Sequence, residues 1–325
     1  MNAQLDRLPI LILYPHNRCN CRCVMCDIWK TDQVKEISAI DLDRHLADME
    51  RLRVEWVVFS GGEPLMHSDL FRLAKLLRAR NIRTTLLSTG LLVKRYASQI
   101  ANHLDDIVIS LDGPPEIHDQ VRRVPGAFAS LSAGVSALFE CELSFPISVR
   151  CTVQKLNCSR LRQTASTARG LGVRCISFLA ADVTSTGFNR DKPWPILKQD
   201  EVSVTASELP SLDAEIEALI REEDCGGFVL ESPEKLRRIA DRFRARIGLA
   251  QPVAPLCNAP WVSAVVEADG TVRPCFFHAP VGNIANGESL LQVLNGDRAT
   301  AFRHNLDVAS NPTCLQCVCS LHRKM

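Results

Sequence analysis

The sequence predicts an α/β protein built around a parallel β-sheet. Six short apolar segments rich in branched residues alternate with segments in which apolar residues recur at helical spacing. This alternation implies βαβ units, in which helical crossovers of right-handed sense join parallel strands. Six such repeats fit a partial β/α barrel as well as an open sheet, because hydrophobic periodicity does not distinguish the two.

Each predicted element follows from a local signal. The first strand is the apolar run PILILY, and the first helix begins at Ser38, which forms the S-x-x-D pattern of a capping box with Asp41. The predicted strands are residues 9–14, 54–59, 83–87, 106–111, 147–152 and 175–179. The predicted helices between them are residues 38–52, 70–80, 93–102, 128–139 and 159–171.

The second half of the sequence has a different character. Residues 181–195 are polar and irregular, and residues 199–221 and 232–247 are predicted to form two amphipathic helices. The second of these begins with Ser232-Pro233-Glu234, a cap followed by proline at the first helical position. A proline-containing connector then leads into a compact segment that carries several cysteines.

Composition limits the classes of protein to consider. The 325 residues suffice for one large or two ordinary domains, and the hydrophobic fraction of 46% is ordinary for a globular protein. The net charge of +1 argues against a broad nucleic-acid-binding surface. The sequence contains neither an apolar run of membrane-spanning length nor an N-terminal signal peptide. We therefore expect a cytoplasmic protein that binds neither nucleic acid nor a membrane.

The sequence holds 14 cysteines, which is many for a cytosolic chain. Disulfide bonds are disfavoured in that compartment, so clustered cysteines point to metal sites. One cluster, near the start, is Cys19, Cys21, Cys23 and Cys26. The other, near the end, is Cys257, Cys275, Cys314, Cys317 and Cys319. The five scattered cysteines are interpreted as small buried hydrophobic residues.

The first cysteine cluster has the spacing of an iron–sulfur site. Cys19, Cys23 and Cys26 form a C-x3-C-x2-C pattern, with Cys21 as a spare. Three thiolates so close together can bind an iron–sulfur cluster, for which thiolate is the usual ligand. No fourth cysteine follows at short range, so the remaining iron of a [4Fe–4S] cluster would be free to bind another molecule. The alternative is zinc, which prefers closed ligand sets built from paired C-x2-C units.

This cysteine loop, directly after an N-terminal strand, resembles that of the radical S-adenosylmethionine (radical SAM) superfamily. The resemblance implies that Cys19, Cys23 and Cys26 hold a catalytic [4Fe–4S] cluster whose open iron binds S-adenosylmethionine. It also implies the fold, because radical SAM cores are similar to three-quarters of an eight-fold β/α barrel. We therefore expect a partial (β/α)6 barrel, with ligands bound at the carboxyl ends of its strands.

The end of the second predicted strand extends the resemblance. Its sequence SGGEP matches the GGEP motif of the family, which implies that Gly61, Gly62 and Glu63 contact S-adenosylmethionine. Paired glycines let a backbone approach a ligand closely, although a plain tight turn is the alternative. The third strand ends in Ser88-Thr89-Gly90, which departs from the Thr-Asn-Gly that the family often has.

The end of the fourth predicted strand carries a further set of expected cofactor contacts. By resemblance, Ser110 and Asp112 lie near the ribose and Arg122 near the carboxylate of S-adenosylmethionine. A guanidinium suits a carboxylate because its fork donates two parallel hydrogen bonds. Arg123 stands where the family usually has glycine, which leaves open which of the two arginines contacts the carboxylate.

The C-terminal cysteines predict a second cluster. The turn signal Asp269-Gly270 suggests a hairpin that brings Cys257 and Cys275 to one site. With Cys314 and Cys317, the pattern is similar to the twitch domain, a short version of the SPASM domain that carries one auxiliary [4Fe–4S] cluster. Cys319 is an alternative to either of the last two ligands, and a structural zinc hairpin is the alternative site.

The sequence therefore predicts a radical SAM enzyme in which the cofactor supplies the radical and the protein positions the substrate. We expect it to cleave S-adenosylmethionine to a 5′-deoxyadenosyl radical that removes a hydrogen atom from a substrate, with the auxiliary cluster assisting oxidation. Only about eight residues precede the first strand, so we expect no N-terminal leader-peptide domain and favour a small-molecule substrate.

Three further expectations accompany this one. The chain is divided into a radical SAM core at residues 1–182, a helical linker at 183–256 and a twitch domain at 257–325. An external flavodoxin- or ferredoxin-type protein is expected to supply electrons. The alternative functions are a peptide-modifying radical SAM maturase, a non-catalytic iron–sulfur electron carrier and a zinc-binding module.

Overall fold

The computed structural model describes residues 3–190 and 192–324, and within them nine strands form one sheet in the order β6-β5-β4-β3-β2-β1-β7-β8-β9. The strands from β6 to β7 are parallel, and β8 and β9 continue the sheet antiparallel. The strands are β1 (Ile10–Leu13), β2 (Trp56–Phe59), β3 (Arg83–Ser88), β4 (Asp106–Ser110), β5 (Ile147–Val153), β6 (Cys175–Ala180), β7 (Ser263–Val266), β8 (Thr271–Arg273) and β9 (Gly282–Asn283). The predicted α/β class with a parallel sheet of alternating strands and helices is confirmed.

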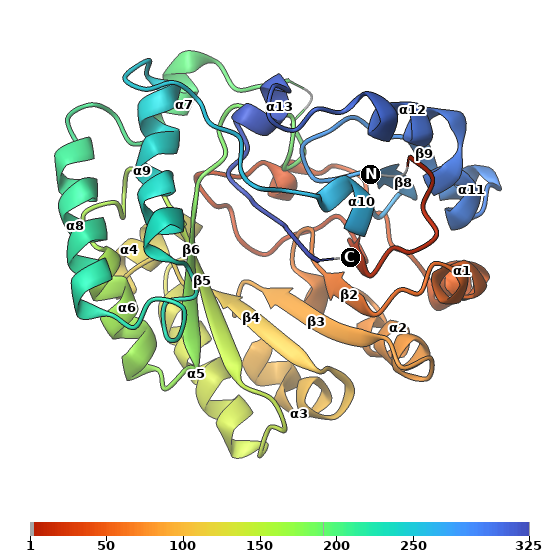
Figure 1. Cartoon of the computed structure of the whole chain (residues 1–325). Helices are drawn as coiled ribbons and strands as arrows, with labels where there is room; N and C mark the ends of the chain where they lie inside the picture. The colour runs from red at the N-terminus through yellow and green to blue at the C-terminus, as the bar shows by residue number, and fades with distance from the viewer. Residues whose placement is uncertain (1–2, 191, 325) are drawn as a thin grey trace.

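Helices cover one side of this sheet, and the C-terminal segment lies across another part of it (Figure 1). The helices of the alternating part are α1 (Ala39–Arg51), α2 (Leu70–Arg78), α3 (Val93–His103), α4 (Pro115–Arg122), α5 (Ala127–Glu140) and α6 (Leu161–Gly170). Those that follow are α7 (Ile196–Val202), α8 (Leu209–Glu222), α9 (Pro233–Arg246), α10 (Ala259–Val262), α11 (Leu290–Asn295), α12 (Asp297–Asn305) and α13 (Pro312–Leu315). No helix in the described part of the chain is both long and apolar enough to cross a membrane.

Local sequence signals explain where several elements begin. The Ser38 side chain accepts a hydrogen bond from the backbone N–H of Asp41, whose own side chain accepts from the Ser38 backbone, so the predicted capping box at α1 is confirmed. A serine also caps α9, where the Ser232 side chain accepts from the N–H of Lys235. The four residues of β1 are all buried, as expected for a strand in the interior of a parallel sheet.

Two predicted features of the chain differ from the structure. The single helix expected at residues 199–221 is wrong, because α7 ends at Val202 and α8 begins at Leu209. Pro210 occupies the first turn of α8, where a missing N–H costs nothing, whereas the interior of one long helix would not tolerate it. In addition, Pro115–Arg122, which lies between the predicted helices and was not among them, forms helix α4.

The strand β1 joins the two ends of the chain. Its register pairs Ile10 to Leu13 with Trp56 to Phe59 of β2 on one side and with Ser263 to Val266 of β7 on the other. The C-terminal hairpin therefore continues the sheet of the core. The division at residues 182 and 256 stays a prediction, and this shared sheet places the two cysteine-bearing segments against a common support.

The loop after β1, residues 14–27, touches the loop after β2 through backbone atoms. The backbone N–H of Glu63 donates to the carbonyl of Arg18 at 2.9 Å. A Cβ atom added at Gly62 would lie 1.8 Å from that same carbonyl oxygen and 3.2 Å from the backbone nitrogen of Cys19. Glycine at position 62 is therefore required by the close approach of the two loops.

A segment after β6, residues 181–195, holds the same loop from the other side. Arg190 and Asp182 form an ion pair at 2.9 Å with side chains only 1% and 2% exposed. The Arg190 guanidinium also donates to the carbonyl of Met25 at 2.7 Å, and the Trp194 indole donates to the Asp27 carboxylate at 2.7 Å. We call residues 181–190 and 192–195 the clamp segment, because it holds Met25 and Asp27, the residues on either side of Cys26.

Replacing Gly62 by alanine should lower the free energy of unfolding by about 1–3 kcal/mol, as overpacking does in other proteins. The added methyl group meets backbone atoms of residues 18 and 19, which no side-chain rotation can move away. Denaturant unfolding measures the effect. Gly170→Ala is the control, because a Cβ atom there meets nothing within 4 Å. Equal stability of the two variants would contradict the close-approach argument.

Replacing Arg190 by glutamine should lower the free energy of unfolding by about 3–5 kcal/mol, the usual cost of leaving a buried charge unpaired. The partner left without compensation is Asp182. Adding Asp182→Asn should restore part of the loss, so the double variant is more stable than the sum of the single effects. Arg221→Gln removes an exposed pair with Glu222 and serves as the control. Additive effects of the Arg190 and Asp182 substitutions would refute the coupling.

Candidate functional site

The N-terminal cysteine loop is fastened to helix α4 through its backbone. The N–H of Arg22 donates to the carbonyl of Arg122 at 3.1 Å, and the N–H of Val24 donates to that of Val121 at 3.0 Å. Cys21 and Cys23 are buried, whereas Cys19 and Cys26 are partly exposed. The structure therefore presents the predicted C-x3-C-x2-C ligands on a braced loop at the carboxyl end of β1.

Cys23 lies in a small charged network. The Arg122 guanidinium contacts its sulfur at 3.5 Å and pairs with the Asp112 carboxylate at 2.6 Å. A hydrogen bond from the Cys21 thiol, followed by the charge of Arg122, lowers the pKa of Cys23 to about 7. A lowered pKa favours the thiolate, the form in which cysteine binds metal. Two predicted cofactor contacts, Asp112 and Arg122, thus lie beside a predicted cluster ligand.

The spare cysteine, Cys21, and the predicted ligand Cys26 have different surroundings. Cys21 is hydrogen-bonded to Cys19 and Cys23, and these contacts, with burial, raise its pKa. Burial, with the nearby Cys23, raises the pKa of Cys26 to about 12. Cys21 therefore shares the loop interior with the three predicted ligands instead of pointing away from them.

Glu63, predicted to contact the cofactor, is fully occupied by protein donors. Its carboxylate accepts from the N–H of Leu65, from the Ser88 hydroxyl, and from both the N–H and the hydroxyl of Thr89, at 2.6 to 3.1 Å. Burial raises its pKa. The Thr89 hydroxyl also contacts the Asn20 side chain in the cysteine loop at 3.0 Å. The contact between Thr89 and Asn20 was not predicted from the sequence, although Thr89 lies at the end of the third predicted strand.

A polar cavity of about 480 Å³ lies where the core meets the C-terminal hairpin. Gly61 and Gly62 line it, and its wall reaches the cysteine loop at Asn17 on one side and Ile28 on the other. Glu63, Ser110, Asp112 and Arg122 are not among its lining residues. The charged residues of its wall are Asp32, Lys35, Arg190, Glu267, Asp269 and Arg273.

Most of these charges are already paired within the protein. Arg273 pairs with Glu267 at 2.6 Å and Lys35 with Asp269 at 3.6 Å, while Arg190 belongs to the clamp segment. Ser110, at the end of β4, is partly buried, and its backbone is opposite Arg150 of β5. The cavity therefore offers a polar, charge-balanced wall next to the Gly61-Gly62 turn.

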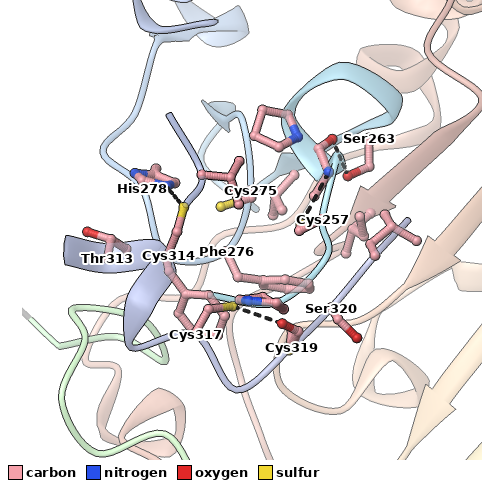
Figure 2. Close-up of a pocket in the computed structure, with 18 residues that line it drawn as sticks. Cys257, Ser263, Cys275, Phe276, His278, Thr313, Cys314, Cys317, Cys319 and Ser320 are labelled. Atoms are coloured by element: carbon pink, nitrogen blue, oxygen red, sulfur yellow. Dashed lines mark hydrogen bonds between the residues drawn. The ribbon is translucent and has the colours of Figure 1, made fainter. Parts of the chain in front are cut away.

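The C-terminal cysteines converge on a second cavity, of about 110 Å³ (Figure 2). All four predicted ligands line it, together with Cys319. The β7–β8 hairpin, which the sequence predicts, brings Cys257 and Cys275 to the same place, and α13 supplies the other side. The four are Cys257, Cys275, Cys314 and Cys317.

One further polar residue of this cavity was missed by sequence reasoning. The His278 ring nitrogen Nε2 lies 3.4 Å from the sulfur of Cys314, and Figure 2 shows the ring directed at that sulfur. The C-x2-H spacing from Cys275 is the signal that could have indicated it. The cavity is otherwise mostly apolar, with Phe276 and Phe277 in its wall.

The donor set of this second cavity fits an iron–sulfur cluster. Five thiols face one mostly apolar space, and thiolates are the usual ligands of such clusters. Within residues 3–190 and 192–324, no three His, Cys, Asp or Glu side chains are grouped so that they could hold a single metal ion. Burial raises the pKa of Cys275 to about 12 and those of Cys314 and Cys319 to about 11, so binding a metal group there must release protons.

Comparison with known families identifies both parts of the chain. A model of the radical SAM superfamily matches residues 13–141, and a model of the iron–sulfur cluster-binding SPASM domain matches residues 257–318. These matches contain, respectively, the N-terminal cysteine loop with the Gly61-Gly62 turn, and four of the five cysteines of the second cavity.

Curated relatives match about half of the chain. An AdoMet-dependent heme synthase of Methanosarcina barkeri is 28% identical over 182 residues, which are 54% of this chain and 52% of that protein. A pre-heme d1 synthase of Dinoroseobacter shibae is 32% identical over 158 residues, which are 47% of this chain and 38% of that protein. The chain thus spans about half the length, or less, of these relatives.

Solved structures share the fold over nearly the whole chain. SuiB of Streptococcus suis, bound to S-adenosylmethionine, has a TM-score of 0.66 at 16% identity, covering 98% of this chain and 74% of SuiB. SuiB bound to its precursor peptide SuiA gives the same TM-score and identity, covering 97% of this chain and 71% of SuiB. The chain therefore matches the radical SAM superfamily over residues 13–141 and the iron–sulfur cluster-binding SPASM domain over residues 257–318, and it shares its fold with SuiB.

Proposed function

We propose that this protein is a radical SAM enzyme that removes a hydrogen atom from a small molecule and uses an auxiliary [4Fe–4S] cluster to complete an oxidation. One observation carries the proposal: Val265 and Phe276 line both the polar cavity and the cysteine-lined cavity. A substrate in the polar cavity would therefore be separated from the auxiliary cluster by little more than these two side chains. Such proximity suits electron transfer between them.

In this proposal Cys19, Cys23 and Cys26 hold the cleaving cluster. When bound and reduced there, this cluster supplies the electron that cleaves S-adenosylmethionine to methionine and a 5′-deoxyadenosyl radical. The chain's own contribution is to hold the three sulfurs in place, through the backbone bonds to α4 and through the clamp segment. Arg122 stabilises the Cys23 thiolate.

The proposed contacts of S-adenosylmethionine are Gly61, Gly62, Glu63, Ser110, Asp112 and Arg122. Gly61 and Gly62 offer their backbone to the polar cavity. Arg122 can stay paired with Asp112 and still contact a carboxylate, because a guanidinium has several N–H donors. Glu63 already accepts from four protein donors, so direct contact with the cofactor requires the hydroxyl of Ser88 or Thr89 to turn away.

The proposed ligands of the auxiliary cluster are Cys257, Cys275, Cys314 and Cys317. Cys319 is the alternative to Cys314 or Cys317. His278 orients the Cys314 sulfur through its ring nitrogen. The relatives named as heme and pre-heme d1 synthases favour a small-molecule substrate and make a tetrapyrrole the first class to test. The SuiB complex with its precursor peptide supports a peptide as the second candidate.

The remaining parts of the proposal concern the electron donor and the cellular location of the protein. The protein would receive electrons from a flavodoxin- or ferredoxin-type protein in the cytoplasm, without nucleic acid or membrane. A non-catalytic electron carrier is the alternative class, and a zinc-binding module is another. Anaerobic iron and sulfide analysis distinguishes the zinc protein from the other two, and an S-adenosylmethionine cleavage assay then distinguishes the enzyme from the carrier.

Replacing Cys19, Cys23 and Cys26 together by alanine should abolish reductive cleavage of S-adenosylmethionine, because the open iron loses its support, while a C-terminal cluster remains. The measurement is dithionite-driven formation of 5′-deoxyadenosine. Cys21→Ala is the matched control and should have a mild effect, since the three ligand positions stay filled. Formation of 5′-deoxyadenosine by the triple variant would contradict the assignment of these three cysteines as ligands of the cleaving cluster.

Reconstituted protein should contain two [4Fe–4S] clusters, or about eight irons per chain, of which Cys275→Ala should lose about half. This variant should still cleave S-adenosylmethionine, because its N-terminal loop is intact. It should not complete the oxidation of substrate, because the electron acceptor is missing. Mössbauer spectroscopy tests the number of clusters. The ratio of product to 5′-deoxyadenosine, both measured in the same reaction, tests the oxidation. About four irons in the unsubstituted protein, or an unchanged ratio of product to 5′-deoxyadenosine in the variant, would contradict them.

A further inference from the structure

Helix α9 carries a row of three arginines, two of which contact the loop that holds the last cysteines. Arg238, Arg242 and Arg246 recur every four residues and therefore share a face of the helix. Arg246 pairs with Asp200 at 2.8 Å. In the part of the chain that the structure describes, no carboxylate lies within the 4.0 Å ion-pair distance of Arg238 or Arg242.

The two unpaired arginines contact the loop that carries the last cysteines. Arg238 donates from Nη2 to the carbonyl of Cys317 at 2.7 Å, and Arg242 donates from Nε to the carbonyl of Gln316 at 2.7 Å. Arg242 also reaches Thr184 of the clamp segment at 2.9 Å. The Nε–H of Arg238 is buried and has no protein acceptor. The groups whose negative charge would act on Arg238 are the thiols of Cys317, Cys319 and Cys257. Those that would act on Arg242 are Cys317 and Asp182, and Asp182 is already paired with Arg190.

Other arginines of the same helix are paired in the ordinary way. Arg237 pairs with Glu217 at 2.7 Å, and Arg244 pairs with Asp213 and Asp241. A half-buried cation without an anion is costly, and two like charges four residues apart on a helix add to the cost. A negative group in the cysteine cavity would offset both. A [4Fe–4S] cluster ligated by four thiolates is such a group, because it carries net negative charge whether oxidised or reduced.

We infer that Arg238, supported by Arg242, positions the auxiliary cluster's loop, compensates its charge and raises its reduction potential. The inference rests on the proposed auxiliary cluster and deepens it. Reduction adds negative charge, so a nearby fixed cation stabilises the reduced form more than the oxidised form. Arg238 thereby makes the cluster a better acceptor for the electron that leaves the substrate.

The test uses the full chain with Cys19, Cys23 and Cys26 replaced by alanine, so that only the auxiliary cluster titrates. Potentiometric titration followed by electron paramagnetic resonance gives its reduction potential. Arg238→Gln should lower the equilibrium constant for reduction about tenfold, or about 59 mV for a one-electron couple. Arg238→Lys keeps the charge and should restore most of the potential. Arg237→Gln, on the exposed side of α9, should leave it unchanged.

The outcomes separate the possible roles. Equal potentials of Arg238→Gln and Arg237→Gln, or an Arg238→Lys variant as shifted as Arg238→Gln, would overturn the charge role. If Arg238→Gln binds no iron and Arg238→Lys binds it, the charge is needed to hold the cluster and the inference stands. If neither Arg238→Gln nor Arg238→Lys binds iron, Arg238 has only a structural role and the inference fails. Absence of iron and sulfide from the parent variant overturns the proposed auxiliary cluster, and the inference with it.

Discussion

The pairing of β1 with both β2 and β7 is the constraint on which the rest of the structure depends. This four-residue strand has a residue of the core on one side and a residue of the C-terminal hairpin on the other at every position of its register. Its carboxyl end delivers the chain into the N-terminal cysteine loop, and the N–H of Tyr14 there still bonds the carbonyl of Val266. Both cysteine groups are thus attached to one buried strand, and Tyr14 and Val265, which lie at its end and on its neighbour β7, line the polar cavity.

Much of the fold and of the candidate site could be predicted from local signals. The alternating strands and helices, the capping box at Ser38 and the hairpin that brings Cys257 and Cys275 together each depend on a few neighbouring residues. The split between α7 and α8 had a local signal as well, since Pro210 fits only a first helical turn. Metal-ligand spacing, likewise, is visible along the chain.

The other missed contacts join residues that are distant in the sequence. Arg190 and Arg238 donate to backbone carbonyls at Met25 and Cys317, and a carbonyl is present at every position, so no residue pattern marks it as a partner. The pairing of β1 with β7 joins strands from opposite ends of the chain, and strand sequences do not specify their neighbours. His278 faces Cys314 only because the turn after β8 is folded against α13. These are consequences of the tertiary structure.

The central position of β1 also bears on how the chain reaches its fold during synthesis. Strands β1 to β6 can pair as they emerge from the ribosome, whereas β7 is made only after a further stretch of helices. Until then one side of β1 is an open edge of apolar residues, from Ile10 to Leu13, with unpaired backbone groups. Such an edge can pair with another chain. In the folded chain the C-terminal hairpin covers this edge, because β7 pairs with β1 at each of its four residues.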